Sequence, residues 1–419
     1  MTSALKRAGV LALNLVAFPL SGLMPRSPRQ WVFGDVSGTF AGNPKFFFLW
    51  LSIHQPQLRL TWITKHRATR DTIRANGYRA HTRSSLGGIW AVLRAKVYVY
   101  GHSVAHINAQ LCKGALYLNL WHGVGLKAVG YEYKGAGRGP RKEKPTWFDH
   151  VRRRHRQIQL TALVTTSDFM QDHFSREFRI PRERCPQLGY SRLDWAFDLQ
   201  LAAAARAIEE GGGFQIKPDG FDELAIYMPT FRDSRRPFLQ EALPDLARLS
   251  AALRERGTLL YLKPHPKTPV EDLSEFDNIR MWPEAVDINT YLADFDVMIT
   301  DYSSVLYDYL LVKDTGALLY TFDMEEYLST DRNLSYPFEE NVAGLRVDTF
   351  AQLCHALTEG SAQDPSIIPD VLRLRRKFWG GSAQPASPAI YRYMQERYLA
   401  DTTRPEPNYV PHTGPVKAD

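Results

Sequence analysis

Short apolar runs alternate with longer amphipathic stretches along the chain from Trp31 to Ala400. The short runs predict buried strands, and the stretches between them predict helices. Regular alternation of the two indicates the α/β class, a parallel sheet with helices on both faces. The expected strands are QWVFG at 30–34, LRLTWIT at 58–64, KVYVYG at 96–101, ALYLNLW at 115–121, ALVTTS at 162–167, LAIYMPT at 224–230, TLLYLKP at 258–264, DVMITDY at 296–302 and GALLYTF at 316–322, and the clearest expected helices are PKFFFLWLSIH at 44–54, LQLAAAARAIEE at 199–210 and SPAIYRYMQERYL at 387–399.

The alternation falls into two series, which the turn-forming stretch GGGFQIKPDG at 211–220 separates. A chain of 419 residues is too long for one ordinary core and fits two domains. We therefore expect an apolar segment at 1–29, an N-terminal α/β domain at 30–210, a C-terminal α/β domain at 211–385, a closing helix at 386–400 and a disordered tail at 401–419.

The apolar segment at the start of the chain is short for a bilayer span. Residues 8–25 carry no charge and are flanked by Lys6, Arg7, Arg26 and Arg29. As a helix they would reach about 27 Å, which is marginal for a bilayer. We favour a monotopic, interfacial helix whose basic flanks meet lipid headgroups. A signal peptide and plain docking onto the domain are the alternatives.

Charge adds one feature to this picture. The formal net charge is +7, and basic residues crowd the stretch from Arg138 to Arg156. Such a cluster suits a phosphate-rich partner: an anionic membrane face, a polyanionic product or a nucleic acid. A solvated basic loop is the alternative. The apolar content of 44% excludes a disordered chain.

Residues capable of chemistry follow the carboxyl ends of four expected strands. In open α/β sheets this edge is where ligands bind. Four such clusters, spread over both series, indicate one shared cleft. They are Trp121-His122-Gly123, Thr230-Phe231-Arg232-Asp233, Lys263-Pro264-His265 and Asp301-Tyr302-Ser303-Ser304.

The pair Ser303-Ser304 begins an expected helix. A helix N-terminus presents unpaired N–H groups and a positive dipole end, which suit a phosphate group. The two hydroxyls add donors, and Asp308 lies one turn further along the same face. An ordinary N-cap is the alternative for Ser303 alone. The combination favours a pyrophosphate site.

Two histidines belong to these clusters. His122 is followed by Gly123 and Gly125, which let the backbone approach a ligand closely. Because a histidine titrates near neutrality, His122 can take a proton from an alcohol. His265 lies between two prolines that stiffen its loop. A structural role is the alternative for either histidine taken alone.

Three further features of the sequence do not indicate a functional site. The DFD at 294–296 precedes its strand, so it lies at the edge opposite the expected cleft, and GAGRGP at 135–140 lacks the spacing of a phosphate loop and indicates a mobile basic loop. The cysteines Cys112, Cys185 and Cys354 are far apart, which indicates free thiols. The sequence shows no metal-ligand cluster.

These motifs resemble the CDP-glycerol glycerophosphotransferase family, which includes teichoic acid primases, teichoic acid polymerases and related capsule polymerases. The most specific part is DINTYLADFDVMITDYSSVLYDYLLVKDTGALLYTFDMEEY at 287–327, and NPKFFFLWL, LWHGVGLKAVG, GYSRLD, YMPTFRDS and KPHP occur in family order. The resemblance covers most of the chain. It implies two Rossmann-like domains facing a cleft, as in glycosyltransferase-B folds, with the acceptor on the first domain and the nucleotide donor on the second.

Carried over position by position, the resemblance implies that His122 and His265 are catalytic. The donor-binding positions it implies are Gly123, Val124, Gly125, Leu126, Arg192, Thr230, Arg232, Lys263, Pro264, Asp301, Ser303, Ser304 and Asp308. The chain departs from the family where Val124-Gly125 replaces Thr-Pro, Phe231 replaces Trp, Lys263 replaces Arg and Ser191 replaces Pro. These departures concern the identity of the donor more than the class of reaction.

We therefore expect transfer of glycerol- or ribitol-phosphate from a CDP-activated donor to an acceptor hydroxyl, with release of CMP. The expected acceptor is lipid-linked or polymeric. The expected location is the cytoplasmic face of the cell membrane, with an anionic membrane surface as partner and no nucleic acid. No cofactor is required, and Mg²⁺ accompanying the donor phosphates is left open. The alternatives are a glycosyltransferase of the same fold and an idle scaffold that binds polyanions or membranes.

Overall fold

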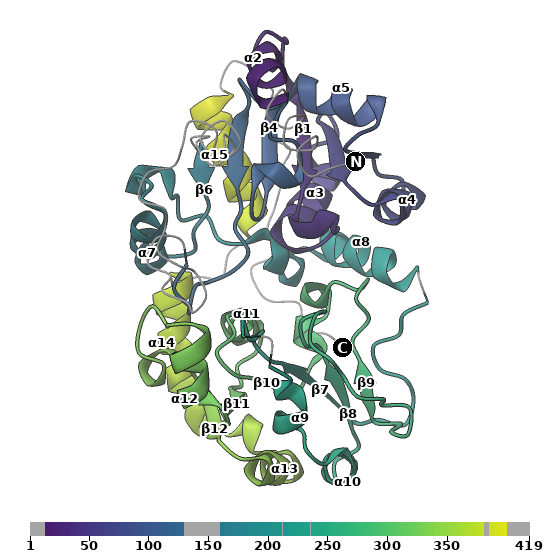
Figure 1. Cartoon of the computed structure of the whole chain (residues 1–419), viewed down its shortest axis with the longest axis vertical. Coiled ribbons are helices and arrows are strands. Elements are labelled where there is room, and N and C mark those ends of the chain that lie inside the picture. Colours follow the sequence, from purple (N-terminus) through teal and green to yellow (C-terminus); the bar gives the residue numbers. More distant parts are fainter. Residues whose placement is uncertain (1–12, 130–159, 212, 235, 381–384, 400–419) are drawn as a thin grey trace.

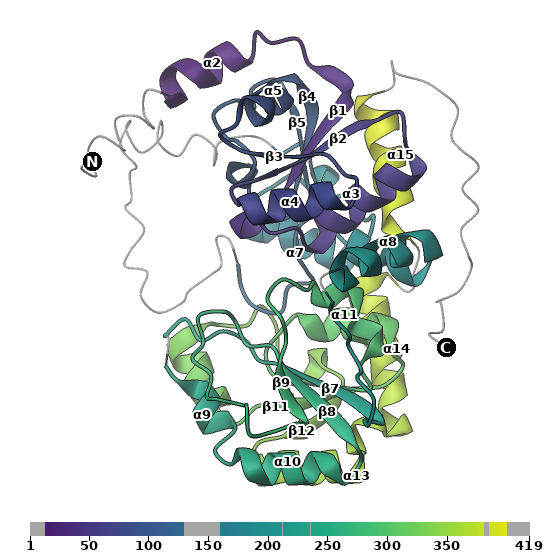
Figure 2. The ribbon, with the colours of Figure 1, turned by 90° about the vertical axis from the view of Figure 1, so that its right-hand side faces the viewer.

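The computed structural model of the chain describes residues 13–129, 160–211, 213–234, 236–380 and 385–399. Within these residues, two six-stranded parallel sheets form two domains along the long axis of the molecule (Figure 1). Helices flank each sheet, as the side view in Figure 2 shows. The prediction of two parallel-sheet α/β domains is confirmed.

The first domain is built on a sheet with the strand order β3-β2-β1-β4-β5-β6. Its strands are β1 Ser27–Gly34, β2 Arg59–Thr64, β3 Ala80–Thr82, β4 Ala95–Tyr100, β5 Leu116–Asn119 and β6 Ala162–Leu163. Its helices are α2 Phe18–Ser21, α3 Gly42–His54, α4 Arg67–Ala75, α5 Leu86–Arg94, α7 Asp168–Phe178 and α8 Leu199–Glu210, with the 3-10 turns η3 Val104–His106 and η6 Ser191–Ala196.

The second domain is built on a sheet with the strand order β12-β11-β10-β7-β8-β9. Its strands are β7 Glu223–Met228, β8 Thr258–Leu262, β9 Ile279–Met281, β10 Val297–Thr300, β11 Ala317–Tyr320 and β12 Gly344–Val347. Its helices are α9 Phe238–Ala242, α10 Leu246–Arg254, α11 Val305–Val312, α12 Met324–Glu326, α13 Phe350–Glu359 and α14 Ile368–Trp379, and α15 Ala386–Tyr398 ends the described chain.

The two sheets share one topology, because β7 to β12 take the places that β1 to β6 take in the first. This is the strand order of doubly wound dinucleotide-binding folds. The direction of winding reverses between β1 and β4 in the first sheet and between β7 and β10 in the second. Ligands of open α/β sheets bind at this reversal, outside the carboxyl ends of the strands. The fold thus provides two candidate binding edges.

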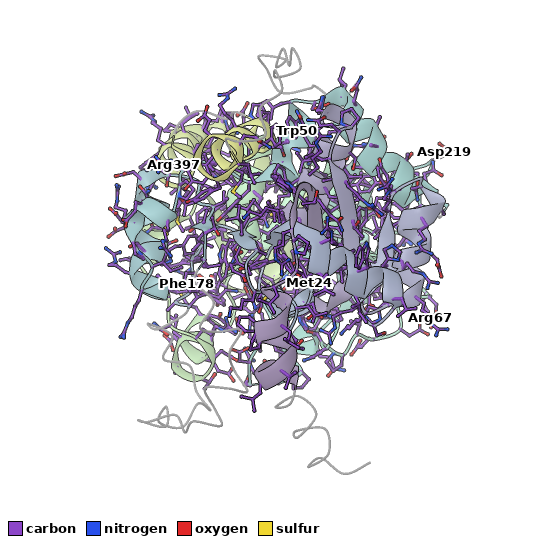
Figure 3. The ribbon with its side chains drawn as sticks, turned by 90° about the horizontal axis from the view of Figure 1, so that it is seen from above. Met24, Trp50, Arg67, Phe178, Asp219 and Arg397 are labelled. Carbon is purple, nitrogen blue, oxygen red and sulfur yellow. The ribbon has the colours of Figure 1, made fainter. Side chains whose placement is uncertain are left out.

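Helix α3 occupies the centre of the first domain. Its residues Phe46 to Leu51 are apolar on all faces and expose at most 2% of their surface. Such a helix must be covered on every side, and here β1, η6, α8 and α15 cover it. Trp50 of α3 packs on Tyr391 of α15 with ring centroids 6.3 Å apart, and Figure 3 shows Trp50 beside that helix. Each such buried side chain contributes about 1.5–3 kcal/mol to folding.

The last helix returns to the first domain. Helix α14 packs on α11, whereas α15 packs on α3 and η6 (Figure 2). Asp194 of η6 caps α15, since its carboxylate accepts the N–H groups of Ala386 at 2.7 Å and Ser387 at 2.6 Å. The chain therefore crosses between the domains twice.

Every predicted strand is present, although β6 keeps only Ala162–Leu163 of its predicted run. Helix α8 has the predicted bounds, Leu199–Glu210, because Asp198 caps its first turn. Three strands were not predicted: β3, β9 and β12. Each is short, and β9 and β12 bury only one residue apiece, so no apolar run marks them.

The start of the chain differs from the prediction in one respect. Arg26 was expected to meet lipid headgroups, but its guanidinium donates to four backbone carbonyls of the first domain, those of Val92, Ala95, Leu111 and Lys113. Among the described residues, none of the helices has the length and apolarity that a membrane crossing needs. The interfacial helix remains a prediction. The basic cluster at 138–156, the loop at 135–140 and the tail at 401–419 lie outside the described residues.

Candidate active site

The loop after β5 carries His122 to the carboxyl edge of the first sheet. Trp121, just before it, has a left-handed backbone with φ 55°. This conformation is costly for a non-glycine residue and persists only where the surroundings hold it. Asn43 of α3 helps to stabilise this conformation, because its side-chain amide donates to the carbonyls of Leu120 at 3.1 Å and Trp121 at 3.0 Å. The asparagine of the NPKFFF motif thus positions the histidine loop.

The imidazole of His122 is solvent-exposed, yet it lies deep among protein atoms. Its Nδ1 lies 3.3 Å from the Gly101 carbonyl oxygen and 3.4 Å from Nδ1 of His102, both in the loop after β4. Burial, and then the nearby His102, lower the pKa of His122 to about 3. The ring is therefore neutral at physiological pH, and one of its nitrogens has a free lone pair.

Gly123 brings the two domains together. Its φ of 151° favours glycine, and a Cβ placed there would lie 3.2 Å from Nη2 of Arg192 and 3.4 Å from the Ser304 hydroxyl. Ser304 belongs to the second domain, so the loop of His122 directly faces the N-terminus of α11. The loop of His122 and the serine pair, far apart in the sequence, are thus close together in the structure.

Arg192 connects the same two elements, the loop of His122 and helix α11. Its guanidinium donates to the His122 carbonyl at 2.6 Å and forms an ion pair with Asp308 of α11. Both side chains are buried, with 7% and 3% of their surface exposed. Nε of Arg192 and Oδ1 of Asp308 have no hydrogen-bond partner. The predicted role of both residues was contact with the donor, whereas the structure uses them to hold the histidine loop against α11.

The serine pair stands free of helix capping. Ser304 is the N-cap residue of α11 and its side chain makes no capping hydrogen bond. The hydroxyl of Ser303 accepts only a long contact, 3.5 Å from the Val305 N–H. Both side chains are half-buried. The two hydroxyls can therefore donate to an anion at the positive end of α11, whereas the N–H groups of Leu306 and Tyr307 already donate to the Ser303 and Ser304 carbonyls at 3.4 and 3.2 Å.

The loop after β8 adds cationic groups. Lys263 is half-buried, and burial lowers its pKa. Pro264 is buried, which holds the loop in place. His265 is exposed, and its ring packs on Phe231 with centroids 4.5 Å apart. Phe231 thus supports His265 from the neighbouring loop after β7.

Arg232 and Asp301 lie beneath the cleft. The Arg232 side chain is fully buried and donates to Asp301 at 3.0 Å and to Asp323 at 2.7 and 2.8 Å. Asp301 also accepts the Thr230 N–H at 2.9 Å. These carboxylates occupy the guanidinium of Arg232. Its side chain is therefore buried in this cluster, whereas the sequence predicted that it contacts the donor. The cluster instead fixes the turn that ends β7 against the turn that ends β10.

The three residues after Gly123 shape the loop from inside. The side chains of Val124 and Leu126 are buried in the core. A Cβ at Gly125 would lie 3.0 Å from Nε2 of His173, so glycine is needed there for space. Val124 and Leu126 therefore present backbone, and not side chains, to a donor.

Two further residues at the edge were not among the predicted site positions. Lys127 is half-buried, its Nζ reaches the Thr230 hydroxyl at 3.4 Å across the domains, and burial lowers its pKa to about 8. It stands inside the quoted LWHGVGLKAVG motif. Asp35 ends β1, and burial raises the pKa of its carboxyl to about 7. A buried acid directly after a strand was the available signal for Asp35.

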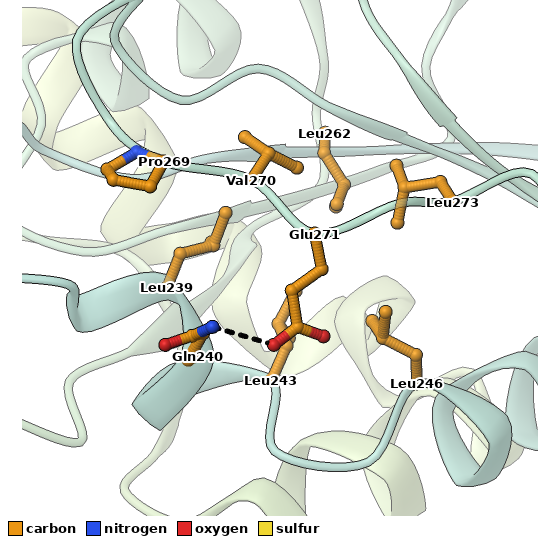
Figure 4. Close-up of a pocket in the computed structure, with 9 residues that line it drawn as sticks. All are labelled: Leu239, Gln240, Leu243, Leu246, Leu262, Pro269, Val270, Glu271 and Leu273. Atoms are coloured by element: carbon orange, nitrogen blue, oxygen red, sulfur yellow. Dashed lines mark hydrogen bonds between the residues drawn. The ribbon is translucent and has the colours of Figure 1, made fainter.

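A separate apolar pocket lies in the second domain, between α9 and the segment from Pro269 to Leu273 (Figure 4). Gln240 donates to Glu271 at 2.9 Å at its mouth. It contains none of the predicted site residues. Within the part of the chain that the structure describes, no group of three or more His, Cys, Asp or Glu side chains is arranged to hold a metal ion.

Proteins with related sequences act in teichoic acid synthesis. Teichoic acid ribitol-phosphate polymerase TarL of Staphylococcus aureus (strain NCTC 8325 / PS 47) is 27% identical over 278 residues, and the match covers 60% of this chain and 43% of TarL. A teichoic acid poly(glycerol phosphate) polymerase of Bacillus spizizenii (strain ATCC 23059 / NRRL B-14472 / W23) is 23% identical over 374 residues, and that match covers 86% of this chain and 91% of the relative. The chain thus spans less than half of TarL.

The fold is that of a solved wall teichoic acid polymerase. A variant of TagF soaked for 15 minutes with CDPG superimposes with a TM-score of 0.74 at 19% identity, over 96% of this chain and 98% of that one. The family model described as CDP-glycerol:poly(glycerophosphate) glycerophosphotransferase matches residues 18–395. With nine-tenths of its length matched, the chain belongs to the CDP-glycerol:poly(glycerophosphate) glycerophosphotransferase family.

Proposed function

We propose that the protein transfers a polyol phosphate, glycerol- or ribitol-phosphate, from a CDP-activated donor to an acceptor hydroxyl and releases CMP. The observation that carries this proposal is the approach of Gly123, beside His122, to Ser304 at the free N-terminus of α11. A neutral base and an anion site thus face each other across one crevice. The names of the relatives and the CDPG soaked into TagF support the choice of donor class and of teichoic acid-like polymers as products.

In the proposed reaction, Nε2 of His122 accepts the proton of the acceptor hydroxyl. The acceptor oxygen forms a bond to the distal phosphorus of the donor, the bond from that phosphorus to the bridging oxygen breaks, and CMP leaves. Since a phosphoryl transition state spreads negative charge over its oxygens, stabilising that charge is most of the catalytic task. The hydroxyls of Ser303 and Ser304, at the positive end of the α11 dipole, would bind one side of the diphosphate.

Two lysines would add positive charge, Lys127 from the first domain and Lys263 from the loop after β8. Burial lowers the pKa of His265 in the same loop, so His265 would act as a neutral hydrogen-bonding group. Mg²⁺ bound to the donor phosphates would add charge of the same kind. In this proposal the protein residues bind the donor phosphates directly and do not coordinate a metal ion.

A turnover screen tests this function. Purified protein is incubated with CDP-glycerol, CDP-ribitol and several nucleotide sugars, each with a polyol-phosphate acceptor, and the nucleotide released is identified. Release of CMP with a new phosphodiester supports the proposal. Release of a nucleoside diphosphate would make the protein a glycosyltransferase instead, and absence of turnover with every donor would favour the scaffold.

We further propose that the first domain rests peripherally on the cytoplasmic face of the membrane. Leu20 and Leu23, in and just after α2, are 56% and 80% exposed, and Leu86 and Trp90 of α5 are 86% and 53% exposed. Figures 1 and 2 both place α2 beside α5 at the same end of the molecule. Arg94 at the end of α5 ties the two together by donating to the Pro25 carbonyl. Four exposed apolar side chains on joined elements are typical of an interfacial anchor.

Vesicle sedimentation tests the membrane contact. Wild-type protein should sediment with vesicles that contain anionic lipid, and the variant L23E/W90E should remain in the supernatant with an unchanged melting temperature. Leu199→Glu is the matched control, because Leu199 is equally exposed, at 53%, but lies on α8 away from this surface. Equal sedimentation of all three proteins contradicts the proposal.

A further inference from the structure

We infer that His102 is a positioning residue for His122, and this inference rests on the proposed function. Nδ1 of His102 lies 3.4 Å from Nδ1 of His122. In this role His102 accepts a hydrogen bond from His122 and so keeps the other ring nitrogen of His122, Nε2, unprotonated and directed to the acceptor. His102 itself makes and breaks no bond to the substrate.

The hydrogen positions follow from the neighbours. The Gly101 carbonyl, 3.3 Å from Nδ1 of His122, can only accept a hydrogen bond, so this nitrogen carries the hydrogen. Nδ1 of His102 faces the same N–H and must then present its lone pair. His102 therefore carries its own hydrogen on Nε2. Both contacts are long, as catalytic hydrogen bonds are before the substrate arrives.

The ring of His102 is solvent-exposed and lies beside Trp121. It is nearly parallel to the Trp121 indole, with an interplanar angle of 10° and centroids 6.0 Å apart. His102 stands two positions after Tyr100, the last residue of β4, which pairs with Asn119 of β5. Pairing of these strands brings the loops of His102 and His122 to the same place on the sheet edge. Partial burial also lowers the pKa of His102, which keeps its lone pair available near neutral pH.

The arrangement acts when charge develops on the base. As the acceptor proton moves to Nε2, His122 becomes an imidazolium, and its Nδ1–H group becomes a stronger donor. Two acceptors, the Gly101 carbonyl and His102, then stabilise it, as the third member of a nucleophile–base–orienter set does. Loss of His102 leaves the Gly101 carbonyl as the one remaining acceptor of the two, which weakens the preference of His122 for the Nδ1–H tautomer.

Three substitutions separate this role from packing. H102N keeps an acceptor near the position of Nδ1, H102F keeps a ring beside Trp121 without an acceptor, and H102A removes both. We expect H102A and H102F to lower kcat by about 10- to 100-fold with little change in the KM of the donor, and H102N to recover most of the loss. H106N, in the same loop, is the matched control and should retain wild-type kcat.

A turnover-free measurement accompanies the kinetics. The ¹⁵N shifts of the His122 ring, assigned with the H122N variant, report which nitrogen carries the hydrogen. Wild type and H102N should show the Nδ1–H form, and H102A a mixture of both tautomers. If wild type turns over no donor, the proposed function fails while this readout still decides the role of His102. Wild-type kcat and tautomer in H102A, or H102N as slow as H102A, would overturn the inference.

Discussion

The guanidinium of Arg192 pairs with the carboxylate of Asp308 across the two domains, directly beneath the carbonyl of His122. One ion pair thereby ties the loop of His122 in the first domain to helix α11, which follows the serine pair, in the second. Because both side chains are buried, neither charge is well solvated without the other. The geometry of the cleft and the stability of the protein therefore depend on the same contact.

Replacing both residues of this pair should destabilise the protein by less than the sum of the two single replacements. We expect R192M and D308L each to lower the free energy of unfolding by about 3–5 kcal/mol, since each leaves one buried charge unpaired. The double variant should lose clearly less than the sum. Urea unfolding of the four proteins measures the coupling. Additive losses would show that the two residues act independently.

Replacement of His122 should affect chemistry and leave folding intact. We expect H122A to lower kcat by at least about two orders of magnitude, because general-base assistance contributes that much or more. The ring is solvent-exposed, so its loss should leave the melting temperature unchanged. CMP release and a thermal melt measure the two quantities. Near-normal turnover in H122A removes this histidine from the mechanism.

We expect the pH profile of kcat/KM to extend further into the acid range than an ordinary histidine allows, and to decline in the alkaline range when Lys127 loses its charge. The pKa of His122 is lowered to about 3, so the base stays neutral well below pH 6.5 and activity should persist at about pH 5.5. The charged or titratable groups facing it are His102, Arg192 and Lys127. Burial lowers the pKa of Lys127 to about 8, so its positive charge, and with it donor binding, should be lost as pH rises past about 8.

The variant K127R tests the alkaline limb. An arginine stays charged at every accessible pH, so the decline should move upward if Lys127 causes it. An acid limb centred near pH 6.5 in the wild type would contradict the assignment of a neutral His122 with a lowered pKa.

Arg232 and Lys263 follow neighbouring strands and should behave in opposite ways. R232M leaves Asp301 and Asp323 buried without their partner, and should cost about 3–5 kcal/mol of stability. K263M removes a half-buried cation from the cleft and should lower turnover with an unchanged melting temperature. Thermal melts and initial rates of both variants distinguish the two roles. A stable but inactive R232M would restore the donor contact predicted from the sequence.

Asp35 should make the protein less stable as pH rises. Its pKa is raised from 3.8 to about 7 by burial, so between these values the folded state binds more protons than the unfolded state. The free energy of unfolding therefore decreases over this window, by up to a few kcal/mol from this one group. D35N has no charge to bury, so its stability relative to wild type should increase from about pH 5 to about pH 8. Urea unfolding at the two values checks this, and a constant difference would disprove it.

Long apolar strands and capped helices could be predicted because local signals and tertiary contacts agree. Helix α8 begins after a side-chain cap at Asp198 and ends at Gly211, and both signals are visible in the sequence. The edge strands carry no comparable signal. In β9 only Ile279 is buried, whereas Arg280 and Met281 are exposed. A single buried residue gives no hydrophobic periodicity from which a strand could be predicted.

The place where the candidate residues meet could be predicted from the sequence, but the contacts among them could not. Strand ends and motif resemblance predict the edge at which the loop of His122 approaches Ser304 in the structure. The pairing of Arg232 with Asp301 and Asp323 could not be predicted, because these partners lie 69 and 91 positions further along the chain. The closeness of His102 to His122 depends on the pairing of β4 with β5, which sequence spacing does not show.

The return of α15 to the first domain links the seat of the last helix to the contact between the domains. Asp194 of η6 accepts the first N–H groups of α15, and Arg192, two positions earlier in the same turn, pairs with Asp308 of α11. A change that displaces η6 should therefore disturb both contacts at once.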